Sequence, residues 1–519
     1  MNIASTKKVA QGVAWASAAS WGCQFLSFAI YAGLARLLTP EAFGLVAIAG
    51  VYIAFIQVLV AQGFGMAIIQ RTQLDDEHLD SAFWIAMATA FVFCLLSHMF
   101  GGQIARLFGE PRIAAVIEWL SFSLFFYGMS SVQIAILTRE LDFRALAIRS
   151  LFATAIAGAV GLGMAFFGWG VWSLVGQQLA NAILGSLFMW WSVSWRPGIR
   201  ISRRHLGDLY KFSLNLTGND LLWFFAQKSD QTMVAYGFGS LGLGPYSLAS
   251  RLPTLLHDGI VGPLQSVAFP TFSRLQSEPL RLERALLKFC EMSTFICFPV
   301  FAGIVAIAPS LVPWLFGAKW LAAIPLLQIL ATYGAVRSAL GFMHPLMLSK
   351  GRAGLYLVMN IVLASLTLVG CLVAVRWSPK VIALSVVLTM SLFAAVFLVI
   401  ARRPLDLKIR PLLKTLVFPS ATSLFMFIVV ALVQRFASTI FTPGITVFVC
   451  VIAGAIFYCV TAYYGRPDLV KAIWELVGSH VLSSDRADRF SAAAVSAEFD
   501  AASVPAEYVA KATPDSSEP

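Results

Sequence analysis

The sequence predicts an all-α polytopic membrane protein of about fourteen transmembrane helices, and three observations support this fold class. Hydrophobic residues make up 59% of the chain and charged residues only 12%, whereas soluble domains carry about a quarter charged residues. Apolar runs of about twenty residues recur along the chain, each long enough to cross a bilayer core of roughly 30 Å. The runs are continuous and do not alternate with polar residues, so the sequence favours helices over a transmembrane β-barrel.

The predicted spans follow one another with short connections. The first six are expected at roughly residues 12–38, 41–68, 79–100, 113–138, 145–167 and 170–194. The next six are expected at 210–236, 241–271, 286–308, 323–348, 353–375 and 380–401, and the last two at 412–434 and 443–464. No small-residue cleavage site follows the basic N-terminus, so residues 12–38 are interpreted as a retained span and not as a signal peptide.

The basic residues predict the orientation of the chain. With the N-terminus in the cytoplasm, 27 of the 37 Lys and Arg residues fall in cytoplasmic segments and only 7 in outer loops. Cytoplasmic segments of membrane proteins typically carry this excess. Both termini are therefore expected in the cytoplasm. Residues 466–519, rich in Ala, Ser, Asp and Glu, are expected to form a mostly disordered cytoplasmic tail.

An internal repeat predicts two lobes. Residues 35–49 read ARLLTPEAFGLVAIA and residues 235–249 read AYGFGSLGLGPYSLA, an offset of 200 residues or six spans. Parallel six-helix repeats occur in transporters whose substrate binds between the lobes. We therefore expect an N-lobe over residues 1–200, a C-lobe over residues 201–403 in a pseudo-twofold arrangement with it, and two extra helices over residues 404–465.

Three segments carry a family resemblance: ARLLTPEAFGLVAIAGVY, KSDQTMVAYGFGSLGLGPYSLASRL and FPTFSRL. They resemble Wzx-type polysaccharide flippases of the multidrug/oligosaccharidyl-lipid/polysaccharide flippase superfamily, in the branch of lipopolysaccharide biosynthesis proteins similar to colanic-acid exporters. The resemblance covers roughly residues 5–465. It implies two six-helix lobes around a central cavity in a bacterial inner membrane. It also implies an undecaprenyl-diphosphate-linked oligosaccharide as substrate, with polysaccharide polymerase and chain-length or export proteins as partners.

Two predicted spans carry matching polar stripes. Gln24 and Tyr31 lie on one face of the first span, and Asp220, Gln227 and Gln231 lie on the corresponding face of the seventh. Lys228 lies at the edge of the second stripe. Such stripes on both lobes favour a hydrated cavity between them, and the alternative for the first span is close helix packing through its small residues.

Two arginines are expected near the membrane midplane. Arg251 shares a polar face of the eighth span with Asp258, and Arg337 shares one of the tenth span with Tyr333. A guanidinium group matches the geometry of a phosphate and stays charged in a low dielectric. We therefore predict a diphosphate and sugar site formed by Arg251, Arg337, Lys228, Gln24, Tyr31, Gln227, Gln231 and Tyr333. The alternative is structural pairing, for instance of Arg251 with Asp258.

Three carboxylates in the second lobe, Asp220, Asp230 and Asp258, are the candidates for coupling transport to H⁺ or Na⁺. Asp230 lies on a different face from Lys228, and its alternative role is a buried hydrogen-bond network.

Motif absences favour a transporter over an enzyme. The sequence has no phosphate-binding loop, no H-E-x-x-H helix, no Cys/His cluster and no G-x-S-x-G elbow, so we expect no ATP, metal, other cofactor or catalytic residue. The net charge of +11 is explained by the cytoplasmic loops and indicates no nucleic-acid partner. The alternatives are an exporter of another lipid-linked precursor or a drug within the same superfamily, a polysaccharide polymerase or ligase, and a membrane scaffold.

Overall fold

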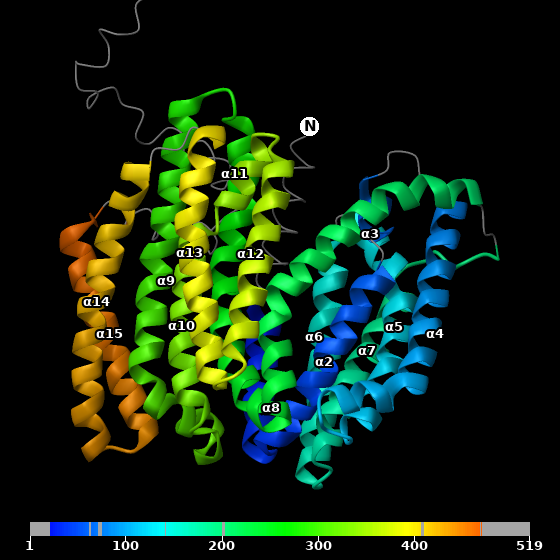
Figure 1. The fold of residues 1–519 in the computed structure, drawn as a ribbon, viewed down its shortest axis with the longest axis horizontal. Coiled ribbons are helices and arrows are strands. Elements are labelled where there is room, and N and C mark those ends of the chain that lie inside the picture. The colour runs from blue at the N-terminus through cyan, green and yellow to red at the C-terminus, as the bar shows by residue number, and fades with distance from the viewer. Residues whose placement is uncertain are drawn as a thin grey trace, which may run out of the picture.

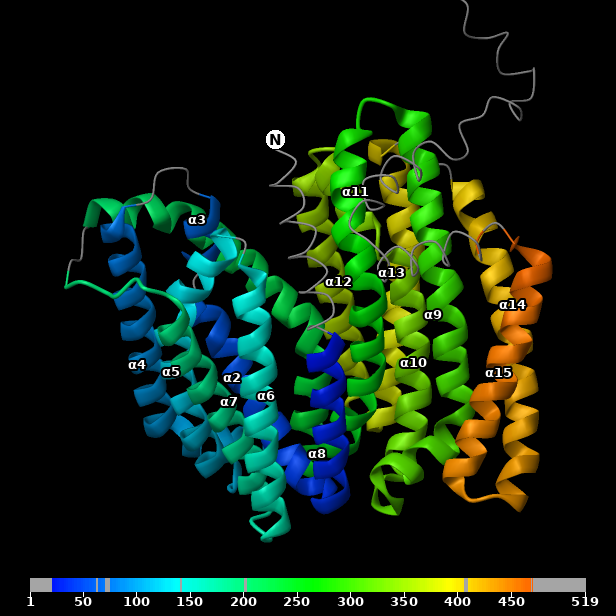
Figure 2. The same cartoon turned by 180° about the vertical axis from the view of Figure 1, so that it is seen from behind.

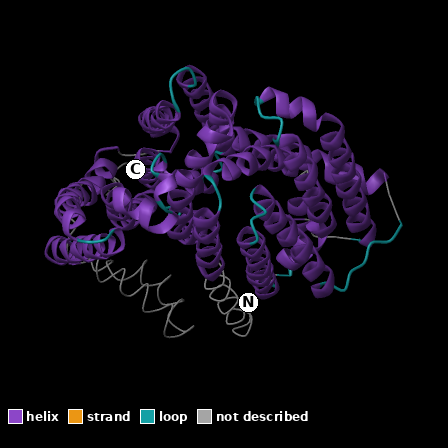
Figure 3. Cartoon of the chain, turned by 90° about the horizontal axis from the view of Figure 1, so that it is seen from below, coloured by secondary structure: helices purple, strands orange, loops and turns teal. Residues whose placement is uncertain are grey.

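The computed structural model describes residues 21–61, 64–70, 75–140, 142–199, 203–405, 409–467 and 469. These residues form helices and connecting loops, with no strand in the described part (Figure 3). The predicted all-α class is confirmed. The start of the predicted first span, residues 12–20, and the predicted tail beyond residue 469 lie outside the described residues.

The N-terminal helices pack together on one side of the molecule (Figure 1). A helix over residues 21–37 is followed by α2 (Pro40–Ala61), α3 (Phe64–Gln70), α4 (Asp76–Leu107), α5 (Ile113–Arg139), α6 (Phe143–Phe166) and α7 (Val171–Ser192). Asp142 caps α6 by accepting a hydrogen bond from the backbone N–H of Ala145 at 3.1 Å. Gly168 and Gly170 have φ values of 81° and 57°, which permits the tight turn between α6 and α7.

The C-terminal helices form the other side (Figure 1). They are α8 (Arg203–Arg274), α9 (Pro279–Phe316), the 3₁₀ helix η1 (Ala318–Trp320), α10 (Ala323–Leu340), α11 (Met343–Ser349), α12 (Ala353–Ala374) and α13 (Pro379–Leu405). The last two helices, α14 (Ile409–Ile440) and α15 (Pro443–Gly465), pack at the edge of this side against α9. There Gln434 donates a buried hydrogen bond of 2.6 Å to the Ser310 hydroxyl.

Four predicted spans differ in continuity from the structure. Spans 210–236 and 241–271 are both present, but they are joined in α8 with one non-helical residue, Gly239, at φ 59° and ψ −156°. The start of α8 also contacts α3 and α4, so the seventh helix is longer than its predicted membrane span. The predicted span 323–348 is broken at residues 341–342 into α10 and α11, and span 41–68 is divided between α2 and α3.

Within the described residues, ten helices are long and apolar enough to cross a membrane by length and composition. The four other predicted spans correspond to residues 21–37, α7 and the two parts of α8, which are also helical. The two parts of α8 carry most of the charged residues predicted for the site, which explains why hydropathy alone does not select them. The described parts of all fourteen predicted spans are therefore mainly helical.

Contacts between the two sides are symmetric, and they follow the 200-residue offset of the sequence repeat. A Cβ atom on Gly44 would collide with the backbone of Ser240, and a Cβ on Gly244 would collide with the backbone of Pro40. Ser240 and Gly244 are the repeat equivalents of Pro40 and Gly44. This reciprocal crossing of the starts of α2 and the second part of α8 is what a pseudo-twofold axis between them produces.

The loops alternate between two faces of the molecule. The α8–α9 turn, which the sequence predicts as cytoplasmic, lies at the top of Figure 1 together with α3 and α11, which lie at the predicted cytoplasmic ends of spans 41–68 and 323–348. The predicted outer turns lie at the bottom. The reverse view gives the same division (Figure 2). The alternation agrees with the predicted path of the chain, and we call the lower face the outer end.

Candidate functional site

The outer end is closed by bonds from side chains of one lobe to the backbone of the other. Arg36, at the end of the first helix, donates through Nε to the Leu315 carbonyl at 2.9 Å and through Nη2 to the Trp314 carbonyl. In the opposite direction, Lys319 donates to the Arg36 carbonyl and Trp320 Nε1 to the Ala35 carbonyl, both at 2.8 Å. Burial lowers the pKa of Lys319 from its usual value.

Trp320 is the apolar centre of this closure. Its side chain is fully buried, and its ring packs edge-to-face on Phe43 of α2 with centroids 5.3 Å apart. Such an aromatic pair contributes about 0.5–1.5 kcal/mol beyond the area that it buries.

An ion cluster completes the closure. Arg112 donates to Glu110 Oε1 at 2.8 Å and to Glu41 Oε1 at 2.5 Å, and Ser240 of the C-lobe donates to Glu110 Oε2 at 3.0 Å. The hydrogen bond from Arg112, supported by that from Ser240, holds the pKa of Glu110 below its usual value. A carboxylate with a depressed pKa stabilises the folded protein at pH values above its unfolded pKa. That contribution is lost as the pH falls through the folded pKa.

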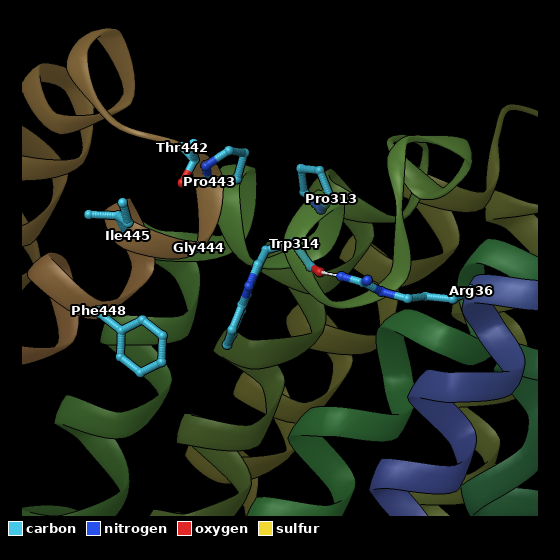
Figure 4. Close-up of a pocket in the computed structure, with 8 residues that line it drawn as sticks. All are labelled: Arg36, Pro313, Trp314, Thr442, Pro443, Gly444, Ile445 and Phe448. Carbon is cyan, nitrogen blue, oxygen red and sulfur yellow. Dashed lines mark hydrogen bonds between the residues drawn. The ribbon is translucent and has the colours of Figure 1, made fainter.

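A pocket of about 500 Å³ lies beside the closure, between α9 and the α14–α15 turn (Figure 4). Arg36 supplies its only charged side chain, and Figure 4 shows that side chain reaching the Trp314 backbone. The other walls are mainly apolar. The pocket is therefore separate from the predicted diphosphate site.

Arg251 is the most exposed of the three predicted site cations, Arg251, Arg337 and Lys228. It lies on the second part of α8, is exposed although it is in mid-helix, and its guanidinium carbon lies 6.0 Å from the centre of the Tyr31 ring on the first helix. At the same interface, Trp21 packs against Gly259. An exposed arginine that faces the other lobe indicates an accessible polar space between them.

Arg337 lies on α10 and faces Asp258 of α8. Its Nη2 is 3.8 Å from Asp258 Oδ1, which is an ion pair without a hydrogen bond. His257 Nδ1 lies 3.1 Å from the same oxygen. The structure thus pairs Asp258 with Arg337 and His257. The alternative interpretation pairs Asp258 with Arg251. The described structure has no ion pair between these two residues, so that alternative is wrong.

Lys228 and Asp230 belong to a hydrogen-bonded group within α8. Lys228 donates to Gln231 Oε1 at 3.1 Å, and Gln231 Nε2 lies 3.5 Å from the Ser250 hydroxyl. Asp230 accepts a 2.7 Å hydrogen bond from the buried Tyr246 hydroxyl. The sequence analysis gives a buried hydrogen-bond network as the alternative role of Asp230. In the structure, the hydroxyl that donates to Asp230 is that of Tyr246.

The other predicted residues are spread around this centre. Tyr333 lies close enough to Arg337 and Asp258 to interact with their charges, and Gln24 and Gln227 are partly buried. Asp220 lies apart from the two arginines, within electrostatic range of Tyr127 on α5. Within the described residues, no group of three His, Cys, Asp or Glu side chains is arranged to hold a metal ion.

The two site arginines differ from Arg139 and Arg149, which bind backbone carbonyls of neighbouring helices. Arg149 donates to the Gly185 carbonyl at 3.2 Å, and Arg139 donates to the Ile68 carbonyl at 2.8 Å. By contrast, the described residues offer no hydrogen-bond acceptor to Arg251 or Arg337. A guanidinium group without such an acceptor has N–H donors free for an anionic ligand.

Sequence reasoning missed several residues that the structure brings to the site or the closure. Within the site these are His257, beside Asp258, and Trp21 on the first helix. At the closure they are Arg36, Lys319, Trp320, Glu110 and Arg112. The closure residues lie in short outer segments and bind backbone carbonyls or each other across the lobes, so no spacing within one helix marks them.

A family model described as polysaccharide biosynthesis protein matches residues 33–325, more than half of the chain. The chain belongs to this family. The matched region contains the three segments that carry the predicted resemblance, which is therefore confirmed.

The chain is also similar to individual polysaccharide biosynthesis proteins. It is 26% identical over 327 residues to the succinoglycan biosynthesis transport protein ExoT of Rhizobium meliloti, covering 63% of this chain and 66% of that one. It is 24% identical to the lipopolysaccharide biosynthesis protein WzxC of Escherichia coli, covering 68% of this chain and 73% of that one.

Solved structures share the fold at low sequence identity. The lipid II flippase MurJ in an inward closed conformation aligns with a TM-score of 0.71 at 14% identity, over 88% of this chain and 99% of that one. An inward-facing multidrug resistance transporter of the MATE family and MOP superfamily aligns with a TM-score of 0.61 at 18% identity, over 74% of this chain and 94% of that one.

Proposed function

We propose that this protein flips undecaprenyl-diphosphate-linked oligosaccharide units from the cytoplasmic to the periplasmic leaflet, by alternating access, for exopolysaccharide or lipopolysaccharide assembly. The observation that carries this proposal is the pair Arg251, within the second part of α8, and Arg337, in the last turn of α10. Among the described residues, neither guanidinium group has a hydrogen-bond acceptor. A diphosphate supplies the anionic oxygens that such groups bind.

The comparisons support the proposal. ExoT is a succinoglycan biosynthesis transport protein and MurJ is a lipid II flippase, and we extend from them the transport of a lipid-linked saccharide to this chain. The excess of basic residues on the face opposite the closure favours that face as cytoplasmic. In this orientation the structure is closed toward the periplasm, which corresponds to the state that receives substrate from the cytoplasm.

In the proposed cycle, Arg251 and Arg337 bind the diphosphate while Lys228 and the neighbouring Gln227, Gln231 and Tyr333 contact the saccharide or the second phosphate. Gln24 and Tyr31 contribute from the N-lobe. Release to the periplasm requires the bonds of Arg36, Lys319 and Glu110 across the lobes to break. These hydrogen bonds are few and lie at the outer end of the molecule, so the closure can open without unfolding either lobe.

An exporter of drugs or of another lipid-linked precursor is the alternative within the superfamily. Positively charged side chains at the centre favour an anionic substrate over a cationic drug. A polymerase or ligase is less well supported, because the described outer connections, such as residues 317–322, are short.

Deletion of the gene tests the proposal. We expect an undecaprenyl-diphosphate-linked oligosaccharide to accumulate in the cytoplasmic leaflet, measured by mass spectrometry of extracted lipids and by its inaccessibility to a glycosidase added to spheroplasts. Accumulation on the periplasmic side would instead indicate a polymerase or ligase.

The orientation gives a separate prediction. Cysteines introduced at Leu107 and Leu321, both exposed at the outer end, should be labelled by an impermeant thiol reagent in intact spheroplasts, whereas a cysteine at the exposed Ile199 should not. The native cysteines, including the exposed Cys459, are first replaced by serine. Labelling of position 199 alone would reverse the proposed orientation.

A further inference from the structure

His257 is a buried titratable residue next to the proposed diphosphate site. Only 6% of its side chain is exposed, and Nδ1 lies 3.1 Å from Asp258 Oδ1. Nε2 is buried and has no hydrogen-bond partner among the described residues. Buried polar atoms are normally hydrogen-bonded, so an orphaned imidazole nitrogen calls for an explanation. With the Nδ1 proton directed at the carboxylate, Nε2 is the position that accepts a second proton.

His257 and Arg337 share one oxygen of Asp258. His257 is at hydrogen-bond distance from Oδ1, and Arg337 Nη2 lies farther away at 3.8 Å. The charged groups that act on His257 are Asp258 on its own helix and Arg337 on α10. Arg251 acts on Asp258 from about two turns earlier in α8, and Tyr333 of α10 lies near the same carboxylate.

We propose that protonation of His257 releases Arg337 from Asp258, so that Arg337 can bind the diphosphate of the substrate. While His257 is neutral, the charge of Asp258 is available to hold Arg337. Once His257 is an imidazolium, it forms the nearer ion pair with Asp258 and repels the guanidinium. The proposal rests on the proposed function, since it concerns the same anionic substrate.

The direction of the pH dependence follows from linkage. Protonation favours diphosphate binding, so diphosphate binding must raise the proton affinity of His257 by the same factor. Affinity is therefore high at low pH and falls as the pH rises through the titration of His257.

The test measures binding to the purified full-length protein in nanodiscs at about pH 5 and about pH 8, the range in which histidine normally titrates. The probe is a short prenyl diphosphate esterified with a sugar at its second end, whose own charge is constant over this range. Wild-type protein should bind it on the order of tenfold more tightly at the lower pH, within the usual range of coupling between two sites.

Two variants should remove the pH dependence in opposite ways. His257→Gln cannot be protonated, so Asp258 continues to hold Arg337 and binding should be weak at both pH values. Asp258→Asn cannot hold Arg337, so binding should be tight at both. His98→Gln, which alters an exposed histidine of α4 bonded to the Cys94 carbonyl, is the matched control and should keep the wild-type pH dependence.

Retention of the pH dependence in His257→Gln would overturn the inference. Its retention in Arg337→Gln would also do so, because His257 would then act on the diphosphate directly. If His257→Gln fails to fold, Asp258→Asn and Arg337→Gln still decide the question. Failure of the proposed function looks different: wild-type protein would not bind the probe at either pH, or Arg251→Ala would bind it normally.

Discussion

Replacing Arg251 by Ala is expected to abolish flipping while the protein remains inserted and folded. Arg251 has no carboxylate partner among the described residues, so its removal leaves no buried charge unpaired. What is lost is a charge-assisted contact to the diphosphate, about 1.5–3 kcal/mol, or on the order of ten- to a hundredfold in affinity. The measurement is binding of the prenyl diphosphate–sugar probe, together with restoration of polysaccharide export in the deletion strain.

Two further variants sharpen this test. Arg251→Lys should recover part of the affinity, because an ammonium group keeps the charge but not the planar donor fork. Arg435→Ala, which removes an exposed arginine of α14, is the matched control and should bind and export normally. Normal export by Arg251→Ala at normal protein level would show that this arginine does not handle the substrate.

A double variant can show whether an arginine binds substrate or only pairs with Asp258, and the structure decides which arginine it should include. Because Asp258 faces Arg337, the informative pair is Arg337→Ala with Asp258→Ala, and not a pair that includes Arg251. Recovery of transport in that double variant would make Arg337 a structural partner of Asp258. Folding without transport would support its role in binding.

The membrane spans could be predicted well, because a continuous apolar run in lipid can satisfy its backbone hydrogen bonds only by forming a helix. Their continuity was harder to predict. Residues 237–240 are expected as a connection between two spans, but in α8 that connection is reduced to one non-helical residue, Gly239, whose positive φ turns the chain within one residue. The break between α10 and α11 at residues 341–342 follows an apolar run that hydropathy reads as one span.

The candidate site shows the same limit at the level of side chains. Helical spacing placed Arg251 and Asp258 on one face, and that placement suggested that they pair. They are seven residues apart, roughly 10 Å along a helix axis, whereas Arg337 approaches Asp258 directly from α10. Periodicity describes the faces of one helix, and the partner from another helix depends on packing that the sequence does not display.

The second prediction with a large expected effect concerns the outer closure, where the two repeats cross. Gly44→Ala is expected to shift the protein toward a state in which the outer ends of the lobes are separated. Its Cβ would collide with the Ser240 backbone, which cannot move aside as a flexible side chain can. Overpacking of this kind costs about 1–3 kcal/mol, which changes a population ratio on the order of five- to a hundredfold.

Gly244→Ala should have the same effect from the other lobe, because its Cβ would collide with the Pro40 backbone in the reciprocal contact. The measurement is the distance distribution between spin labels at Leu37 and Leu321, which are exposed at the outer end on opposite lobes, in a background without native cysteines. Each variant should move the population from a short to a longer distance.

Gly50→Ala in α2 and Gly262→Ala in α8 are the matched controls, because a Cβ at either position meets nothing within 4 Å. They change the same two helices without a collision, and alanine favours helix over glycine by about 1 kcal/mol. Their distance distributions should match the wild type. Equal shifts in the controls would attribute the effect to helix propensity. A shift for only one of Gly44 and Gly244 would show that the two crossings do not contribute equally to the closure.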